Sequence, residues 1–206
     1  MSLLRCLAAA LAVLSLALPS AARAVEPALI EALRTGGYVL YFRHAQTDWT
    51  QSDQSKDAGW ASCAPTRMRQ LSAAGRETAR QVGEALRQLK IPVGQVLASE
   101  FCRTQETARL LGLGEVAVTR ALINETHAEH AGGSAALRDA AKRLMATPPP
   151  KGTNTVLVAH GNVFKLVSDR RPVEAGAAVL RPDGRGGFEV VAHVTPDEWI
   201  RLANTQ

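Results

Sequence analysis

Residues 38–47 read YVLYFRHAQT, an apolar run that ends in an arginine, a histidine and further polar residues. Two glycines precede the run, and aromatic or β-branched side chains fill most of residues 38–42, so this segment predicts a buried strand. Arg43 and His44 then stand where that strand ends. The position matters because ligands of parallel α/β sheets bind beyond the C-terminal ends of the strands.

Short apolar runs and amphipathic segments alternate through the rest of the chain. We expect further strands at 95–99, 115–119 and 155–159, and a hairpin formed by 177–181 and 188–194. We expect helices at 27–34, 72–90, 101–111, 134–146 and 163–167 and after residue 195, with a long loop over 43–70. This alternation predicts the α/β class, as a single domain with three α/β/α layers and a mainly parallel central sheet.

Length and composition exclude several classes of protein. The chain has 206 residues, of which 46% are hydrophobic and 21% charged, and its net charge is +5. The apolar content supports a core and excludes a disordered tail. Three Cys are too few for a disulfide-rich mini-protein. The length fits one domain, or at most two small ones.

The first 24 residues read as a signal peptide, which leaves one domain over residues 25–206. Arg5 precedes an apolar run over residues 6–18, and Ala-Arg-Ala at 22–24 supplies the small residues of a cleavage site. The run is shorter than the roughly 20 residues that cross a membrane, although an uncleaved anchor is the alternative. Cleavage removes two arginines and lowers the net charge from +5 to +3. We therefore expect an exported protein, periplasmic or secreted, without stable membrane insertion.

The four strands expected to be parallel end in residues with a shared chemistry. Arg43 and His44 follow the first strand, Arg103 follows the second, Glu125 the third and His160 the fourth. A neutral imidazole can attack phosphorus, while guanidiniums and a second histidine hold the phosphoryl oxygens. A carboxylic acid can then protonate the leaving alkoxide. This chemistry requires neither a thiol nucleophile nor a metal, and we expect no cofactor.

The segment RHAQT resembles the Arg-His-Gly-x-Thr signature of the histidine phosphatase (phosphoglycerate mutase-like) superfamily. The resemblance covers residues 36–195 and continues with LSxxG at 71–75, SxxxRTxxTA at 99–108 and VAHG at 158–161. It implies the phosphoglycerate mutase-like fold and a phosphohistidine intermediate. His44 matches the phosphorylated nucleophile, and Arg43, Arg103 and His160 match the rest of the phosphate pocket.

The resemblance also implies that Glu125 is the proton donor, as in the smaller branch of the family. The other large branch carries His-Asp after the last core strand, whereas Gly161 follows the histidine here. Three other acids remain alternatives as donor, namely Glu129, Asp48 and Asp53. The chain also departs from the signature at residue 45, where an alanine adds a methyl group that we expect the site to tolerate.

Two cysteines, Cys63 and Cys102, remain once the leader with Cys6 is removed. In an oxidising compartment they are a candidate disulfide pair, and two independent buried thiols are the alternative. A bridge between them would stabilise the fold by about 4 kcal/mol in the chain-entropy model. We expect it to tie the long loop to the helix that carries Arg103.

Two further groups of residues leave alternatives open. Trp49 and Trp60 flank the long loop, and they either line a substrate pocket or pin the loop to the body of the protein. His127 and His130 lie among acidic residues at a spacing that metal sites use, but no further cluster completes a ligand set, so we expect no metal.

These observations predict an exported phosphatase that hydrolyses a phosphate monoester through a phosphohistidine on His44. Its expected partner is a small phosphorylated substrate. A phosphomutase of the same fold and a catalytically inactive anion-binding or scaffold protein are the alternatives. A nucleic-acid partner is not expected, because the excess charge of the mature chain is small and we find no stripe of basic and aromatic residues.

Overall fold

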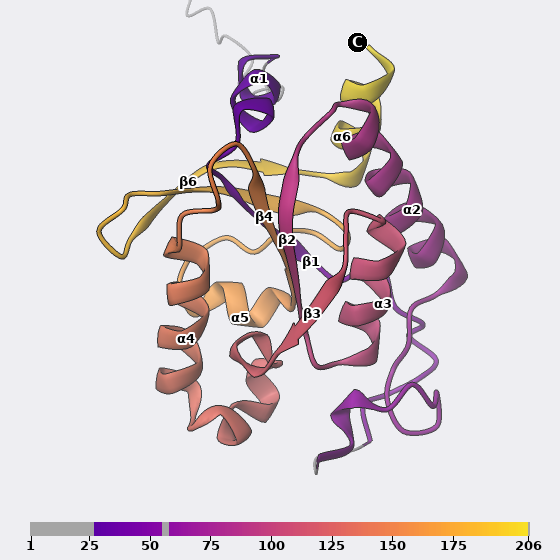
Figure 1. The fold of residues 1–206 in the computed structure, drawn as a ribbon. Helices are drawn as coiled ribbons and strands as arrows, with labels where there is room; N and C mark the ends of the chain where they lie inside the picture. The colour runs from indigo at the N-terminus through magenta and orange to yellow at the C-terminus, as the bar shows by residue number, and fades with distance from the viewer. Residues whose placement is uncertain (1–26, 55–57, 206) are drawn as a thin grey trace, which may run out of the picture.

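A six-stranded sheet forms the centre of the protein in the computed structural model, which describes residues 27–54 and 58–205 (Figure 1). Its strands are β1 (Val39–Arg43), β2 (Val93–Ser99), β3 (Val116–Thr119), β4 (Asn154–Ala159), β5 (Ala177–Pro182) and β6 (Phe188–Val194). They lie in the order β3-β2-β4-β1-β5-β6. The first four strands are parallel, and β5 pairs antiparallel with both β1 and β6. The prediction of a mainly parallel sheet with a terminal hairpin is confirmed.

Helices cover both faces of this sheet. They are α1 (Pro27–Thr35), α2 (Ala73–Gln88), α3 (Cys102–Leu111), α4 (Ser134–Ala146), α5 (Gly161–Lys165) and α6 (Pro196–Asn204). Side chains of α1, α2, α3 and α6 share one buried cluster with one face of the sheet, and those of α4 and α5 share another with the opposite face. The expected three-layer α/β/α architecture is therefore present. The predicted signal peptide, residues 1–24, lies outside the described residues.

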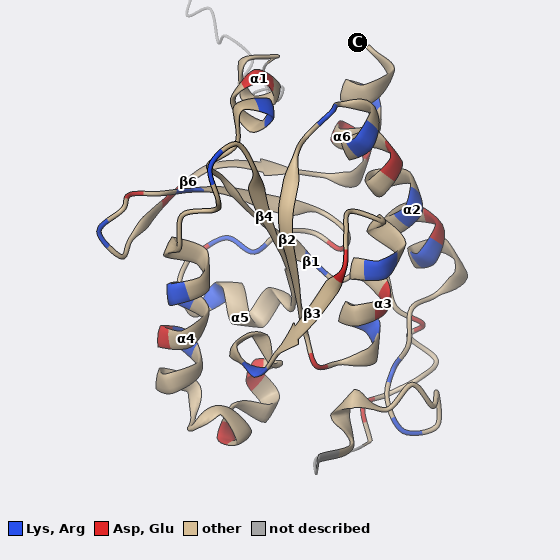
Figure 2. Ribbon diagram, in the orientation of Figure 1, with Lys and Arg blue, Asp and Glu red and all other residues tan. Residues whose placement is uncertain are grey.

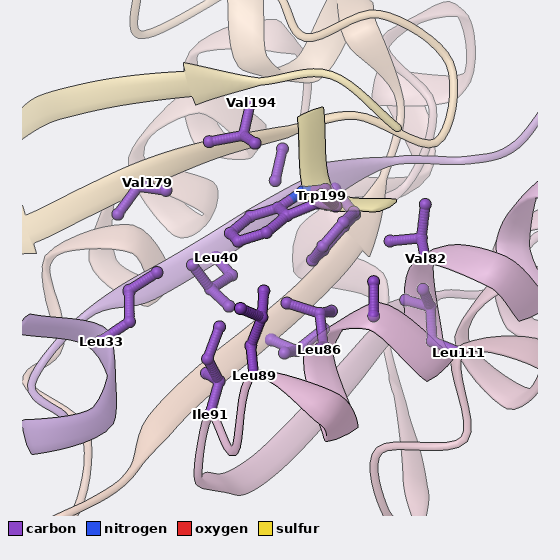
Figure 3. Packing of buried hydrophobic residues seen from close by; sticks show 14 of the residues in the cluster. Leu33, Leu40, Val82, Leu86, Leu89, Ile91, Leu111, Val179, Val194 and Trp199 are labelled. Atoms are coloured by element: carbon purple, nitrogen blue, oxygen red, sulfur yellow. The ribbon is translucent and has the colours of Figure 1, made fainter. Parts of the chain in front are cut away.

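Trp199 of α6 is the largest fully buried side chain of the first cluster. Figure 3 shows its indole beside Leu40 of β1 and Leu86 of α2, so the last helix closes the core that the first strand begins. The helix begins at a capping box, in which Thr195 and Glu198 bond to each other's backbone N–H groups. Truncation of such a buried tryptophan to alanine costs roughly 3–5 kcal/mol.

Three segments differ from the sequence-based expectation. The helix expected at 163–167 begins at Gly161 instead, because the extended backbone of His160 makes that residue its N-cap. Residues 120–131 contain two 3₁₀ helices, Arg120–Leu122 and Glu125–Ala131, the second capped by Asn124. The loop expected over 43–70 contains a short 3₁₀ helix at Ala58–Ala61.

Positions of Lys and Arg are interspersed with positions of Asp and Glu along the ribbon (Figure 2). On α2, for example, Glu77 pairs with Arg80 and Glu84 pairs with Arg87. In the described part of the chain, no helix combines the length and the apolar character needed to cross a membrane.

Candidate active site

His44 follows β1 directly, at the edge of the sheet where the parallel strands end. Its backbone N–H donates to the carbonyl of Ala159 on β4 (2.9 Å), and its Nδ1 lies 2.9 Å from the carbonyl oxygen of Ala45. A carbonyl oxygen only accepts hydrogen bonds, so Nδ1 carries the ring proton and Nε2 keeps its lone pair. Burial, reinforced by the positive charge of Arg103, lowers the pKa of His44 to about 3. The imidazole is therefore neutral near pH 7.

His160 stands at the end of β4, and its ring meets that of His44 edge-on with 5.5 Å between centroids. Its Nε2 lies 3.1 Å from the hydroxyl oxygen of Ser99, whereas its buried Nδ1 has no hydrogen-bond partner in the part of the chain that the structure describes. Burial and the nearby charge of Arg103 hold the pKa of His160 well below its usual value. The hydroxyl of Tyr41 fixes the backbone by donating to the His160 carbonyl (2.8 Å).

Arg103 projects from the first turn of α3 and is almost completely buried. Its two terminal nitrogens donate to the two carboxylate oxygens of Asp53, at 2.9 and 3.1 Å. Its guanidinium carbon lies 4.6 Å from the ring centroid of Phe101. The buried Nε, on the other edge of the guanidinium, has no partner among residues 27–54 and 58–205. This edge is therefore a donor available to an anion.

Arg43 ends β1, and its guanidinium donates to the carboxylate of Glu174 (3.0 Å). Burial lowers the pKa of Arg43, Glu174 opposes that shift, and the charge of Arg171 adds to it. A Cβ atom at Gly161 would lie 3.2 Å from Cδ of Arg43 and 3.0 Å from Cδ of Arg171. The glycine of the VAHG motif thus lets both arginine side chains pass close to the start of α5.

The remaining motif residues fix the backbone on either side of the nucleophile. The Ser72 hydroxyl caps α2 by accepting from the N–H of Gly75 (2.9 Å). A Cβ atom at Gly75 would lie 2.1 Å from the carbonyl oxygen of Gln46, so only glycine allows this approach. Thr107 of α3 accepts from the backbone N–H of Ala45 (3.1 Å).

Ala45, the departure from the family signature, is fully buried. Its methyl group belongs to a small apolar cluster with Leu71, Ala79 and Ala175. The added methyl is accommodated by packing in that cluster.

Glu125 begins the 3₁₀ helix Glu125–Ala131, and its carboxylate accepts a hydrogen bond from the Ser134 hydroxyl (3.2 Å). The preceding residue, Asn124, accepts from the side-chain amide of Asn162 (2.8 Å), which stands two residues after His160. This contact ties the segment of Glu125 to the C-terminal end of β4. The side chain of Glu125 itself is directed to Ser134.

Two of the alternative acids, Asp48 and Asp53, have contacts that favour their ionised form. Hydrogen bonds from Thr50, and one from Gln51, hold the pKa of Asp48 below its usual value. Burial raises the pKa of Asp53, but the charge and hydrogen bonds of Arg103 outweigh burial, so the net shift is downward. Both carboxyl groups are therefore ionised at neutral pH. The carboxylate of Glu129 lies 3.5 Å from the ring of His130 and is largely exposed.

Cys63 and Cys102 form a disulfide with 5.3 Å between their Cα atoms. The predicted bridge is therefore present, and it joins the long loop to the residue that precedes Arg103. Beside it lies a cavity of about 590 Å³, whose lining includes both cysteines, Asp48 and Arg76. Neither His44 nor His160 belongs to that lining.

The structure separates the roles of the two loop tryptophans. Trp60 is buried and donates from its indole nitrogen to Glu100 (3.0 Å), whereas Trp49 is 68% exposed. The rings of His127 and His130 pack against Trp60, with centroid separations of 5.9 and 4.3 Å. Among the described residues, no three His, Cys, Asp or Glu side chains gather as a metal-ligand set.

Three residues of the site have contacts that sequence reasoning missed. Asp53, considered only as a proton donor, is the partner of Arg103, and Glu174 is the partner of Arg43. Arg69 adds a further guanidinium, and its backbone carbonyl accepts from Arg103 (3.4 Å). These contacts join residues far apart in the chain, and the local sequence pattern around each of them carries no signal for its partner.

Residues 39–145 match the model of the histidine phosphatase superfamily, branch 1. The chain belongs to the histidine phosphatase superfamily. That match includes the segments of Arg43, His44 and Arg103, which carried the resemblance in sequence, and it extends over Glu125. Among curated proteins, none matches this sequence at a significant level.

Solved structures show the same fold at low sequence identity. A putative alpha-ribazole-5'-P phosphatase from Escherichia coli aligns with a TM-score of 0.55 at 15% identity, over 78% of this chain and 98% of that one. Phosphoserine phosphatase from Entamoeba histolytica, in complex with 3-phosphoglyceric acid, aligns with a TM-score of 0.54 at 11% identity, over 79% and 98%. The protein histidine phosphatase SixA, complexed with tungstate, gives 0.50 at 18% identity, over 78% and 97%. The phosphoglycerate mutase-like fold is thus established.

Proposed function

We propose that this protein is an exported phosphatase that hydrolyses a phosphate monoester through a phosphohistidine on His44. One observation carries the proposal: the ring of a neutral, buried His44 lies 5.5 Å from that of His160, and buried nitrogens of Arg103 and His160 lack partners in the described part of the chain. Buried donors without partners are costly, so such a cluster favours an anion as its ligand. Membership of a phosphatase superfamily supports the same function.

In the first step, Nε2 of His44 attacks phosphorus and forms the N–P bond while the bond from phosphorus to the ester oxygen breaks. Nε of Arg103 and the guanidinium of Arg43 donate to the phosphoryl oxygens as negative charge develops on them. In the proposed mechanism Ser99 donates to Nε2 of His160, 3.1 Å away, which assigns the ring proton to Nδ1 and makes it a further donor. Glu125 acts as the general acid and gives a proton to the leaving alkoxide.

In the second step, water attacks the phosphohistidine and the N–P bond breaks. The Glu125 carboxylate takes a proton from that water, phosphate leaves, and His44 returns to its neutral state. The Nδ1–H bond to the Ala45 carbonyl holds the ring in one orientation through both steps. We propose that the reaction needs no metal, because guanidiniums supply the positive charge that a metal ion would supply elsewhere.

Export is part of the proposal. The N-terminal 24 residues have the pattern of a signal peptide, and a disulfide such as Cys63–Cys102 persists in oxidising compartments. An exported enzyme is a phosphatase rather than a mutase in this proposal, because a mutase relies on phosphorylated metabolites at intracellular concentrations. Its substrate is then a small phosphate ester outside the cytoplasm.

The test compares wild type with His44→Ala on a panel of phosphate esters, in the presence of EDTA. We expect wild type to release phosphate, and the variant to lose about 10⁴-fold or more of kcat, as nucleophile removal does in other enzymes. Acid quenching with labelled substrate should trap phosphate on His44 in wild type. A wild type that transfers phosphate without net release would be a mutase, and one that is inert towards the whole panel would be an anion-binding protein.

A further inference from the structure

Trp49 is the most exposed of the large apolar side chains that the structure describes. Trp60 already fixes the same loop to the body of the protein, through its burial and its bond to Glu100. The indole of Trp49 therefore contributes little to packing of the loop. Isolated exposed apolar residues are common on protein surfaces. The exposure of Trp49 therefore indicates a binding role only if its neighbours belong to a functional site.

Trp49 lies opposite Arg69 in a pair of antiparallel segments. Thr47 forms an antiparallel bridge with Leu71, and the N–H of Asp48 donates to the carbonyl of Gln70 (3.0 Å). The same register places residue 49 across from residue 69. The guanidinium carbon of Arg69 indeed lies 3.9 Å from the centroid of the Trp49 ring, within the range of a cation–π contact. Arg69 thus holds the indole in a defined orientation from one side.

Arg69 in turn adjoins the proposed phosphate pocket. Its backbone carbonyl accepts from Arg103 (3.4 Å), and its backbone N–H donates to the carboxylate of Asp53 (3.0 Å). Its positive charge contributes to the lowered pKa of His44 and of Arg43. Its buried Nε has no hydrogen-bond partner among the described residues. The Trp49–Arg69 pair therefore adjoins residues of the proposed phosphate pocket through the contacts of Arg69 with Arg103 and Asp53.

We propose that Trp49 and Arg69 form the subsite for the alcohol part of the phosphate ester, and that this part is a ring with a flat apolar face. The proposal rests on the proposed function of the His44 pocket and specifies its substrate class. The open face of a tryptophan stacks on aromatic rings and on the C–H face of sugars, because both present polarised C–H groups or π surface to it. An acyclic ester lacks such a face.

The test compares kcat/KM of wild type, Trp49→Ala and Trp49→Phe on three esters. Para-nitrophenyl phosphate carries an aromatic ring, glucose 6-phosphate carries a sugar ring, and O-phosphoserine is acyclic. Val118→Ala is the matched control, because Val118 is also exposed but lies on β3, the edge strand. Inhibition by inorganic phosphate, which fills the phosphate pocket alone, is measured for every variant.

We expect Trp49→Ala to lose about three- to tenfold of kcat/KM on at least one of the two ring esters, a loss typical of one aromatic contact. Trp49→Phe should retain most of that activity, and phosphoserine turnover and phosphate inhibition should stay unchanged. A loss on para-nitrophenyl phosphate would indicate an aromatic substrate, and a loss on glucose 6-phosphate would indicate a sugar. Equal losses on all three esters, or no loss on either ring ester, would overturn the subsite. A wild type inert on every ester would instead contradict the proposed function itself.

Discussion

The two sides of the candidate site are held in place by different kinds of contact. On one side, His44 and His160 follow β1 and β4, adjacent parallel strands in which Arg43 pairs with Ala159. Both histidines are buried, and backbone hydrogen bonds fix their positions. On the other side, the loop between β1 and α2 brings Asp53 and its neighbours to α3 through side-chain contacts and one disulfide.

This difference separates two functions within one site. A nucleophile needs a fixed position, which strand ends provide at little cost in conformational entropy. A substrate-binding surface varies more readily when it lies on a loop, because insertions there leave the sheet intact. The strand side therefore carries the chemistry in our proposal, and the loop side carries substrate recognition. Substitutions at the strand ends should therefore mainly lower kcat, whereas substitutions in the loop should mainly raise KM and have smaller effects.

The largest difference should appear between two arginines, Arg103 on α3 and Arg69 on the loop. We expect Arg103→Ala to lower kcat/KM by about 10³-fold, because its N–H groups stabilise charge that develops in the transition state. Arg103→Lys should restore little of this, because an ammonium lacks the planar fork of donors. Arg69→Ala on the loop should lower kcat/KM less, by about ten- to a hundredfold, the effect of one hydrogen bond that involves a charged group.

Steady-state kinetics on para-nitrophenyl phosphate check both values, with thermal unfolding of each variant as the control for folding. An equal loss of kcat/KM in Arg69→Ala and Arg103→Ala would contradict the separation of chemistry and substrate recognition. In that case the loop arginine takes part in the transition state, and the two sides share the chemistry.

The Cys63–Cys102 disulfide should make a large contribution to the free energy of unfolding, and it acts on the loop between β1 and α2. In the chain-entropy model, closing a loop with a sequence separation of 39 residues stabilises the fold by about 4 kcal/mol. We expect the double variant Cys63→Ser, Cys102→Ala to lose up to that amount in urea unfolding, and to raise KM more than it lowers kcat.

Wild type treated with reductant should behave as the double variant does, whereas the double variant itself should not respond to reductant. A fall in kcat without a change in KM would show that the bridge positions Arg103 rather than the loop.

The difference between strand ends and loop also explains which parts of the site could be predicted from the sequence. The strands, the helices and the residues at the strand ends were predictable, because local periodicity encodes an element and parallel sheets bind ligands just beyond the ends of their strands. In this way the sequence predicted that His44, Arg103 and His160 lie at one edge of the sheet, and the structure places the rings of His44 and His160 5.5 Å apart. The disulfide was predicted from the count of cysteines and the compartment.

The ion pairs of the two site arginines could not be predicted from local sequence patterns. The pairing of Asp53 with Arg103 spans 50 residues, and that of Arg43 with Glu174 spans 131. A single acid in a polar loop has the same local pattern whether it is solvated or bonded to a buried guanidinium. Its partner is decided by tertiary packing, so Asp53 was considered only as one of several proton donors.

The smallest expected effect concerns Asp53, the loop residue closest to the chemistry. Its carboxylate occupies the terminal nitrogens of Arg103 and leaves the Nε edge open, so a bound phosphate lies next to a second negative charge. Asp53→Asn removes that charge and keeps an oxygen that accepts from Arg103. Coulomb repulsion between unit charges some 6 Å apart amounts to about 1.4 kcal/mol at an effective dielectric constant of about 40.

We therefore expect Asp53→Asn to tighten inhibition by inorganic phosphate by about tenfold at low ionic strength. Added salt should reduce that gain. Asp139→Asn, which removes an exposed acid on α4, should leave the inhibition constant unchanged. Weaker inhibition in Asp53→Asn would mean that the carboxylate is needed to orient Arg103, so that the loop would help to hold the chemistry in place and the two sides would not be separable.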